Sequence, residues 1–395
     1  MAKKQKKPQQ SSAGAVRETR SQSVKHIRIP LWPKPLAFVE NDPSATKIKT
    51  MQELLAVSLP PTRPAYETGR LEGTKQMNQE ERMLYNETTK MTKVVFLKDL
   101  VTQAHTALYE KLQLLDIKDT TEDLLYLLAR IHPSVMAAGH SKIIHCEGET
   151  EMRAYNTLFR PALLAICEAL KRAQTSEEHW PDLGSAPSSK VIPDGRLCLR
   201  DQAGKEKCIL TIEYKTPFAM LCKDDDTARE AKLSLLWELQ YIPTNVKIDY
   251  GQAMRFLWPT PDESTAALIG DEKEADPQTR ILIQVWTQMV VEECHLAVLS
   301  SEDITIFFAR GKGENQDTLY LSPPYTKDRC PLYAVYCWFA VAYGLADLKL
   351  PDPVVKWKEE ELIAITASGI TPSTLYSRLS PQPHKGKAVS HSKAS

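Results

Sequence analysis

Two acidic residues and a lysine stand in a pattern that could hold a divalent cation against a phosphate. Asp194 lies in the segment VIPDGRLCLR, and Glu213 and Lys215 lie in the later segment KCILTIEYK. Mg²⁺ prefers oxygen ligands and keeps several waters, so two carboxylates can hold it beside a phosphate group. A bound cation polarises a phosphoryl group and lowers the pKa of water, and a lysine offsets negative charge in the transition state. These residue types predict metal-dependent hydrolysis of a phosphodiester.

Strand geometry predicts that these three side chains converge. Side chains on a strand alternate between its two faces, so Glu213 and Lys215 project to the same side. If the two segments form a hairpin centred between Ala203 and Gly204, Asp194 lies opposite Glu213, with Cβ atoms about 5 Å apart. Two carboxylates at that separation repel each other unless a cation or a proton intervenes.

The apolar residues of the same hairpin test that register. It pairs Leu197 with Leu210 and Leu199 with Cys208 on the other face of the hairpin. One face is then apolar, and the other collects the acidic and basic side chains. A slip of one residue would move every side chain of a strand to the other face and scatter the proposed site.

The Glu-x-Lys spacing is short, and similar spacings occur elsewhere in the chain. The other pairs are Asp116 and Lys118, Glu230 and Lys232, and Asp347 and Lys349. None of them follows a Pro-Asp on a preceding β segment. For an isolated match, the simpler interpretation is an ion pair on an exposed sheet face. The preceding Pro-Asp segment is therefore what favours a site at Glu213 and Lys215.

PDG followed after an interval by IEYK resembles the split Pro-Asp…(Asp/Glu)-x-Lys signature of the PD-(D/E)XK nuclease superfamily. The resemblance covers residues 145–325, roughly. It implies an α/β fold with a restriction-endonuclease-like core, which is a small mixed sheet flanked by helices. It also implies that Asp194 and Glu213 bind Mg²⁺ or Mn²⁺, and that Lys215 takes part in the hydrolysis of DNA or RNA.

The order of the predicted elements is similar to the order in that superfamily. Periodicity of apolar residues predicts a helix over 149–172, strands around 191, 197 and 210, a helix over 279–293, a hairpin of strands around 297 and 306, and a helix over 331–345. A polar loop is predicted after the first helix, because Pro181, Gly184 and Pro187 fall there.

A second motif extends the resemblance. Residues 284–289, QVWTQM, resemble the Gln-x-x-x-Tyr-Met helix of fungal nuclease-like members of the superfamily, in which the Gln lies near the metal and the substrate. The resemblance gives that role to Gln284. Gln288 stands where the tyrosine is usual, which is a departure from the pattern. The alternative for Gln284 is an amide on the helix surface.

Many members of the superfamily place a further carboxylate, from the first helix, beside the metal. Glu151 is our choice for this third metal ligand, because it lies one turn before Tyr155 and continues the predicted apolar face of the helix. Glu147 and Glu149 are alternatives. A solvated charge near the helix N-terminus, stabilised by the helix dipole, is an equally good interpretation.

The 395 residues divide by composition. Helices are predicted over 96–115 and 121–131, before the nuclease-like part. The stretch after the Glu213 strand is too long for a bare loop, which predicts helices over 228–240 and 250–257. We expect disordered basic tails over residues 1–30 and 372–395. Between them we expect a helical N-terminal region over 31–135, a nuclease-like domain over 136–350 with a helical insertion at 222–277, and a C-terminal extension over 351–371.

The distribution of charge bears on the partner. The formal net charge is zero, but residues 1–30 hold eight Lys and Arg against Glu18, and residues 372–395 hold four with no acid. The body between them is therefore acidic, so contacts with DNA or RNA must be local or supplied by the tails. A catalytically inactive nuclease-fold module that binds protein or nucleic acid is the alternative function. Residues 30–130 could also form a separate interaction domain.

Cysteines and apolar runs bear on location. The eight cysteines lack CxxC spacing, and no apolar segment follows Met1 as in a secretory signal, which predicts a reduced intracellular protein, nuclear or cytoplasmic. The longest uncharged run, 330–346, falls short of the roughly 20 apolar residues of a membrane span, so no membrane partner is expected. His140, His145 and Cys146 lie close together, but no second pair completes a zinc site.

Overall fold

The computed structural model describes the residues that form a mixed sheet and its helices. They are residues 28–36, 48–57, 59, 63–64, 90–119, 143–144, 147–173, 180–184, 193–200, 203–216, 253–256, 277–301 and 303–355. Several predictions fall outside these residues: the helices over 121–131 and 228–240, the strand around 191 and nearly all of both tails. His140, His145 and Cys146, for which no zinc site is expected, also lie outside them.

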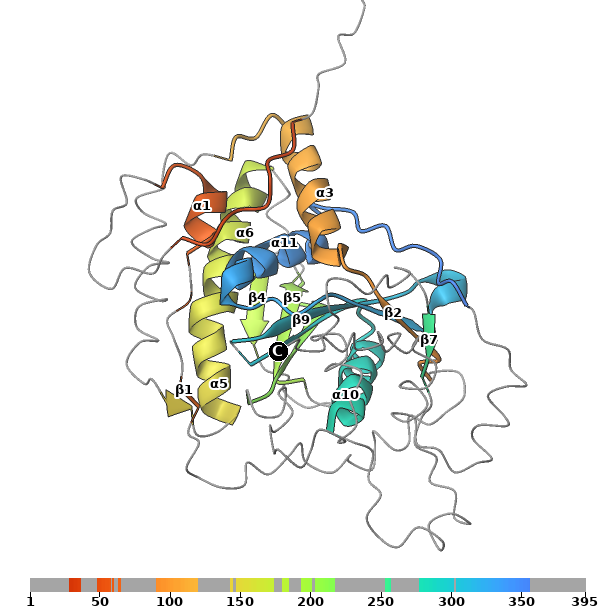
Figure 1. The fold of residues 1–395 in the computed structure, drawn as a ribbon. Coiled ribbons are helices and arrows are strands. Elements are labelled where there is room, and N and C mark those ends of the chain that lie inside the picture. The colour runs from red at the N-terminus through yellow and green to blue at the C-terminus, as the bar shows by residue number, and fades with distance from the viewer. Residues whose placement is uncertain are drawn as a thin grey trace, which may run out of the picture.

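The centre of the fold is an eight-stranded mixed sheet (Figure 1). Its strands, in order across the sheet, are β4 (Trp180–Gly184), β5 (Gly195–Arg200), β6 (Glu206–Tyr214), β8 (Leu296–Ser300), β9 (Thr305–Arg310), β10 (Thr318–Leu321), β2 (Lys93–Phe96) and β7 (Ala253–Arg255). β6 and β8 run parallel, as do β10 and β2, whereas the other neighbours are antiparallel. β1 (Arg63–Pro64) and β3 (Ile143–Ile144) form a separate parallel pair.

Helices pack on both faces of the sheet. One face carries α1 (Met51–Leu55), α3 (Leu100–Leu114), the continuous helix of α5 (Glu147–Ala154), η4 (Tyr155–Phe159) and α6 (Arg160–Arg172), and α11 (Pro331–Ala342). The other face carries α10 (Pro277–Val291). Figure 1 shows α11 in blue and α10 in teal on opposite sides of the sheet. Two 3₁₀ turns, η6 (Gly313–Asn315) and η7 (Lys327–Arg329), lie in loops. The predicted α/β class is confirmed.

Alternation along the central strands fills two separate cores. Ile212 and Val298 lie in the core beneath α6 and α11, whereas Leu299 and Phe308 lie in the core beneath α10. β6 and β8 are thus covered on both faces, as parallel neighbours in α/β proteins usually are. A polar side chain at the end of β6 is therefore taken out of water unless it reaches the rim of the sheet.

The N-terminal region contributes to the same sheet and core. β2 pairs with β10, and α1 and α3 share the core of α11. Phe96, predicted to begin a helix, is the last residue of β2, and the helix begins at Leu100. The β-branched Val94 and Val95 favour the strand. Among the described residues, this region is built into the body rather than standing apart from it.

Both edge strands differ from the prediction. The helix predicted over 250–257 is wrong, because Ala253–Arg255 form β7 and pair with β2. The loop predicted around Pro181 is also wrong, because Trp180–Gly184 form β4 and pair with β5. A proline is tolerated in an edge strand, since one side of that strand has no ladder to complete. Neither edge strand could be recognised from its own residues, because another strand supplies its hydrogen bonds.

A π-helical turn interrupts the helix over 147–172. In η4 the N–H of Arg160 donates to the carbonyl of Tyr155, five residues earlier. Pro161 has no N–H with which to continue the α-helical ladder, which explains the wider turn at this place. The turn shifts the buried face of the helix. Tyr155, predicted on that face, is 36% exposed, whereas Phe159 is fully buried.

Among the remaining elements, α1, β1, β3 and β10 were not predicted. β8 and β9 form the expected antiparallel hairpin, and α10 and α11 lie where helices are predicted. No helix in the described part of the chain is long and apolar enough to cross a membrane.

Candidate metal centre

The hairpin of β5 and β6 has the predicted register at its open end. Gly195 pairs with Ile212. Carried one residue further, this register places Asp194 opposite Glu213. The backbone N–H of Tyr214 donates to Asp194 Oδ2 at 2.7 Å, which fixes the carboxylate against the end of β6.

The register changes nearer the turn of the hairpin. Cys208 pairs with Cys198, not with Leu199 as predicted. The reason is a β-bulge, in which β6 carries Ile209 as one extra residue. The bulge lies on the turn side of Leu210, so the register between Leu210 and the candidate site is kept.

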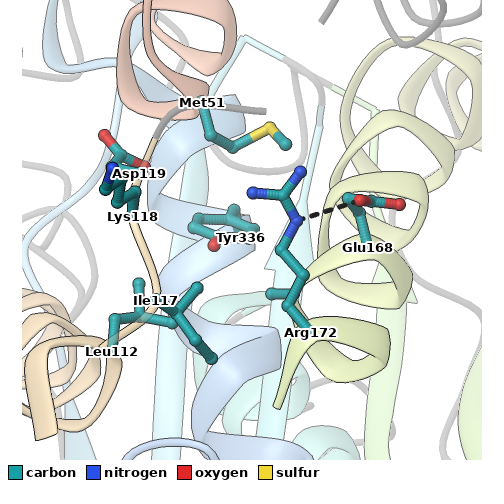
Figure 2. Close-up of a pocket in the computed structure, with 9 residues that line it drawn as sticks. Met51, Leu112, Ile117, Lys118, Asp119, Glu168, Arg172 and Tyr336 are labelled. Atoms are coloured by element: carbon teal, nitrogen blue, oxygen red, sulfur yellow. Dashed lines mark hydrogen bonds and ion pairs between the residues drawn. The ribbon is translucent and has the colours of Figure 1, made fainter. Parts of the chain in front are cut away.

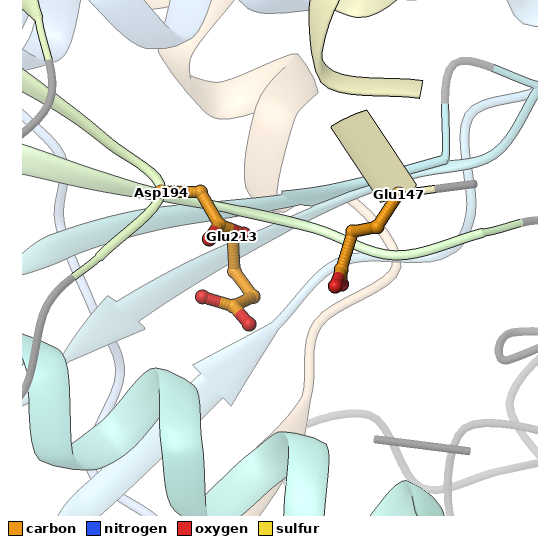
Figure 3. Close-up of side chains that lie close together, drawn as sticks. All are labelled: Glu147, Asp194 and Glu213. Atoms are coloured by element: carbon orange, nitrogen blue, oxygen red, sulfur yellow. The ribbon is translucent and has the colours of Figure 1, made fainter. Parts of the chain in front are cut away.

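Three carboxylates from separate elements converge at the end of β6 (Figure 3). One oxygen from each of Glu147, Asp194 and Glu213 lies within 4.8 Å of the others. Glu213 belongs to β6 and is 2% exposed, Asp194 directly precedes β5, and Glu147 begins α5 and is exposed. The cluster is therefore closed on the side of the sheet and open at Glu147.

The carboxylate from the first helix is Glu147, not Glu151 as predicted. Glu151 is exposed, whereas Thr150 is fully buried. Glu147 is the first residue of α5, and Glu151 lies one turn later on the same side of the helix. The carboxylate at the N-terminal end of the helix is therefore the one that meets Asp194 and Glu213. The prediction extrapolated one regular apolar face back from α6. The π-turn between α6 and α5 breaks that regularity.

Lys215 reaches two of the three carboxylates. Its ammonium donates to Glu147 Oε1 at 2.7 Å, to Glu213 Oε1, and to the carbonyl of Tyr214 at 3.0 Å. Its backbone N–H donates to the carbonyl of Ser300 at 3.1 Å, which ties this residue to the end of β8. Glu213 and Lys215 therefore share one side of the strand, as alternation predicts.

The amide that contacts the cluster is that of Gln288, on α10. Its Nε2 donates to Glu213 Oε2 at 2.6 Å, and the side chain is 1% exposed. Gln288 Oε1 is buried without a hydrogen-bond partner in the described part of the chain. Gln284, predicted to lie near the metal, is one turn earlier and only partly buried. The amide that donates to the carboxylates is therefore that of Gln288 and not that of Gln284.

Burial controls protonation in this cluster. It raises the pKa of Asp194 from 3.8 to about 7, and the charge of Glu213 adds to the shift. Burial also raises the pKa of Glu213, against the opposing effect of Lys215. Burial alone would lower the pKa of Lys215, but the charges of Glu213, Glu147 and Asp194 raise it. The lysine is therefore protonated at neutral pH, while Asp194 holds its proton to a higher pH than an ordinary aspartate.

This group of residues could hold a metal ion. Three carboxylates face each other, and Lys215 is the cation that pairs with them among the described residues. Carboxylate oxygens are the ligands that hard cations prefer. A cation between them would relieve the repulsion and the loss of hydration that raise the pKa of Asp194.

A small cavity lies elsewhere, between α1, α6 and α11 (Figure 2). Met51, Asp119, Arg172 and Tyr336 are among its lining residues, and burial raises the pKa of Asp119 to about 6. Its volume of about 20 Å³ has room for roughly one water molecule. It is too small for a nucleotide, and it lies on the face of the sheet away from α10. It is therefore not a candidate substrate pocket.

The predicted site residues meet in part. Asp194, Glu213 and Lys215 lie together in the expected arrangement, and Glu147 and Gln288 join them. Glu147 had been an open alternative, whereas Gln288 was singled out only as a departure from a motif. No protein-family model matches this chain, and no curated protein or solved structure matches it either.

Proposed function

We propose that this protein hydrolyses phosphodiester bonds of DNA or RNA with Mg²⁺ or Mn²⁺, and that its core is of the restriction-endonuclease-like PD-(D/E)XK type. The observation that carries the proposal is the convergence of Asp194, Glu213 and Lys215, in the register expected of that signature, with Glu147 as a third carboxylate. A bare Glu-x-Lys on a strand would require neither Asp194 nor a carboxylate from a helix.

The three carboxylates would hold the cation through oxygen ligands. When bound, a divalent cation polarises the phosphoryl group and lowers the pKa of an attacking water. Glu213 is the most constrained of the three, because Lys215 donates to its Oε1 and Gln288 to its Oε2. Such contacts fix the direction of a ligand before substrate arrives, which lowers the reorganisation needed during the reaction.

Lys215 acts in this proposal as a positive charge and not as a general base. A base must be able to accept a proton, and the neighbouring carboxylates raise the pKa of Lys215. Its ammonium can instead orient water and offset the charge that develops on the phosphoryl oxygens. The ammonium contacts both Glu147 and Glu213, so a cation that uses the same oxygens must displace at least part of these ion pairs.

The proposal is tested by incubating the purified full-length protein with labelled single-stranded DNA, duplex DNA and RNA, in Mg²⁺, Mn²⁺ or EDTA. Cleavage should require the metal and should be abolished by Asp194→Asn and by Glu213→Gln, because each removes an anionic ligand. Asp347→Asn and Lys349→Met are matched controls, since they change the exposed Asp-x-Lys pair at 347–349 and should leave cleavage intact.

Cleavage that persists in EDTA or in Asp194→Asn would refute the proposal. Divalent-cation binding without cleavage of any substrate would instead favour the second candidate, an inactive nuclease-fold module. The burial of Gln288 against Glu213, at a position that departs from the family motif, is the observation that keeps this candidate in view.

A further inference from the structure

A second group of charged residues lies at the other end of the strands that carry the candidate centre. His295 directly precedes β8 and Arg310 ends β9. The backbone N–H of Arg310 donates to the carbonyl of His295 at 2.8 Å, which extends the β8–β9 ladder by one pair. The exposed Lys207 and Lys312 lie near the start of β6 and just after β9. We call Lys207, His295, Arg310 and Lys312 the basic cluster.

Arg310 lacks the counter-charge that a half-buried guanidinium usually has. Its guanidinium carbon lies 5.7 Å from the ring centroid of Trp286, and one terminal nitrogen donates to the carbonyl of Met289 at 3.5 Å. Arg310 Nε is buried with no partner, and no carboxylate pairs with this side chain within the described ranges. Burial lowers the pKa of Arg310, which means that its charge is poorly solvated.

Arg196, on the same face of the sheet, shows the ordinary arrangement. It donates to Glu292 at 2.9 Å and lies 3.7 Å from Glu206. Glu292 pairs with Arg196, and Glu206 pairs with Arg196 and Arg200, so neither carboxylate pairs with Arg310. The Nε atoms of both arginines lack a hydrogen-bond partner in the described part of the chain, and the difference between them is the counter-charge. An unpaired, partly buried guanidinium costs stability unless an anion binds to it.

The surroundings of His295 are also positive. Burial lowers the pKa of His295, and Arg310, Lys312 and Lys207 are the charges that lower it further. Its Nδ1 is buried without a hydrogen-bond partner among the residues described. Because the imidazole is neutral and three cations lie beside it, the cluster carries a net positive charge. Two of its nitrogens, His295 Nδ1 and Arg310 Nε, have no hydrogen-bond partner in the described part of the chain.

His295 and Arg310 of the basic cluster lie on the same face of the sheet as the candidate centre, because their neighbours Leu296 and Ala309 face the opposite core. Glu213 and Arg310 both contact α10, through Gln288 and through Met289. Glu213 pairs with Leu299 on β8. His295 lies four residues before Leu299, which is about 13 Å along the strand. One extended anionic ligand could therefore reach both places.

We propose that the basic cluster is a binding site for a phosphate-class oxyanion, with the Arg310 guanidinium as its main contact and Lys207 and Lys312 at its rim. A guanidinium suits this ligand because its planar fork matches two phosphate oxygens. The ligand is either free phosphate or a phosphate of the nucleic-acid backbone. The site requires no metal, so it does not depend on the hydrolysis proposed above.

The first test is a calorimetric titration of the full-length protein with inorganic phosphate in EDTA. Wild-type protein should bind saturably, and Arg310→Gln should weaken binding by at least about 10-fold, the effect of losing hydrogen bonds to a charged group. Arg329→Gln is the matched control, because it removes an exposed arginine in η7 and should bind like wild type. Absence of saturable binding to the wild type would overturn the proposal.

A second variant tests the site in case Arg310→Gln does not fold. Lys207→Gln with Lys312→Gln changes only exposed side chains, so it should fold normally, bind phosphate several-fold more weakly and show a smaller dependence on salt. Unchanged affinity in this double variant, together with unchanged affinity or failure to fold in Arg310→Gln, would refute the site.

The source of the phosphate is settled by a parallel titration with a short oligonucleotide, also in EDTA. If Arg310→Gln weakens oligonucleotide binding as much as phosphate binding, the ligand is the nucleic-acid backbone. If it weakens only phosphate binding, the ligand is a free phosphate compound. Either result supports the site, and the measurement can be made whether or not the protein cleaves nucleic acid.

Discussion

The α10 face of β5 and β6 carries two groups of ionised residues that differ in their balance of charge. Near the turn of the hairpin, Arg196 and Arg200 pair with Glu292 and Glu206, two cations with two anions. At the open end, three carboxylates lie together, and the ammonium of Lys215 pairs with two of them, Glu147 and Glu213. Both groups hold strands and α10 together, and both are partly buried.

Charge balance separates the two groups. The arginine group is balanced in charge, so it needs no further counter-ion. The carboxylate group keeps an excess of negative charge in a buried place, and burial raises the pKa of Asp194 to about 7 as a result. Strained titratable groups of this kind occur more often in sites than in structural ion pairs. The two groups should therefore differ in function as they differ in charge.

The largest effect is expected from Lys215→Met. Cleavage should fall by about 100-fold, because one positioned positive charge is lost from the reaction. Metal affinity should stay the same or increase, since the ammonium no longer competes for Glu147 and Glu213. Single-turnover rates and a metal titration on the same preparation measure the two quantities. A loss of metal affinity as large as in Asp194→Asn would show that Lys215 has been given the wrong role.

Gln288→Leu should reduce kcat by about 10-fold with little change in KM, at the lower end of the effects of residues that orient a ligand. The reason is that Glu213 Oε2 loses its donor. Gln284→Leu on the same helix is the control and should leave kcat unchanged. Steady-state kinetics decide the matter, and equal losses in the two variants would mean that α10 is simply destabilised.

Glu292→Gln should act on stability and not on activity. Arg196 loses its closest ionised partner, so the free energy of unfolding should fall by about 1–3 kcal/mol. Denaturant unfolding gives this value, and cleavage below the transition should match that of wild type. If Glu292→Gln were as inactive as Glu213→Gln, the arginine group and the carboxylate group would not differ in function as we expect.

The smallest effect concerns pH. Asp194 has a raised pKa in the folded protein, so the folded state binds its proton more tightly than the unfolded chain does. Its contribution to stability is therefore present below pH 3.8 and is lost as the pH rises from there to about 7. Thermal unfolding in EDTA should show a smaller decline over this range in Asp194→Asn than in wild type. An identical pH dependence would contradict the raised pKa.

The local part of the candidate site could be predicted from sequence. Asp194, Glu213 and Lys215 lie within one hairpin, and the alternation of strands together with the position of the turn at Gly204 sets their faces. The φ of +79° at Gly204 is one that glycine adopts readily, which places the turn where the sequence indicates it. This prediction was possible because the three residues are close in the sequence and because strand side chains alternate with a fixed period of two.

The rest depends on tertiary contacts that a local pattern does not reveal. Glu147 belongs to the site because α5 begins two residues before the predicted start of the helix, and the π-turn at Tyr155–Phe159 breaks the regular pattern that the prediction extended back from α6. Gln288 does so because α10 crosses the end of β6. β7 is a strand only because β2 lies beside it. In each case the position of the residue or strand depends on a contact with a segment far away in the chain or on an irregularity of the backbone.

The most direct test of the central claim is the binding of Mn²⁺ to the full-length protein, followed by electron paramagnetic resonance. One site should saturate in wild type and in Glu292→Gln, and Glu213→Gln should lose it, because only the unbalanced carboxylate group offers oxygens to a cation. Failure of the wild type to bind Mn²⁺, or equal binding by Glu213→Gln, would contradict the account.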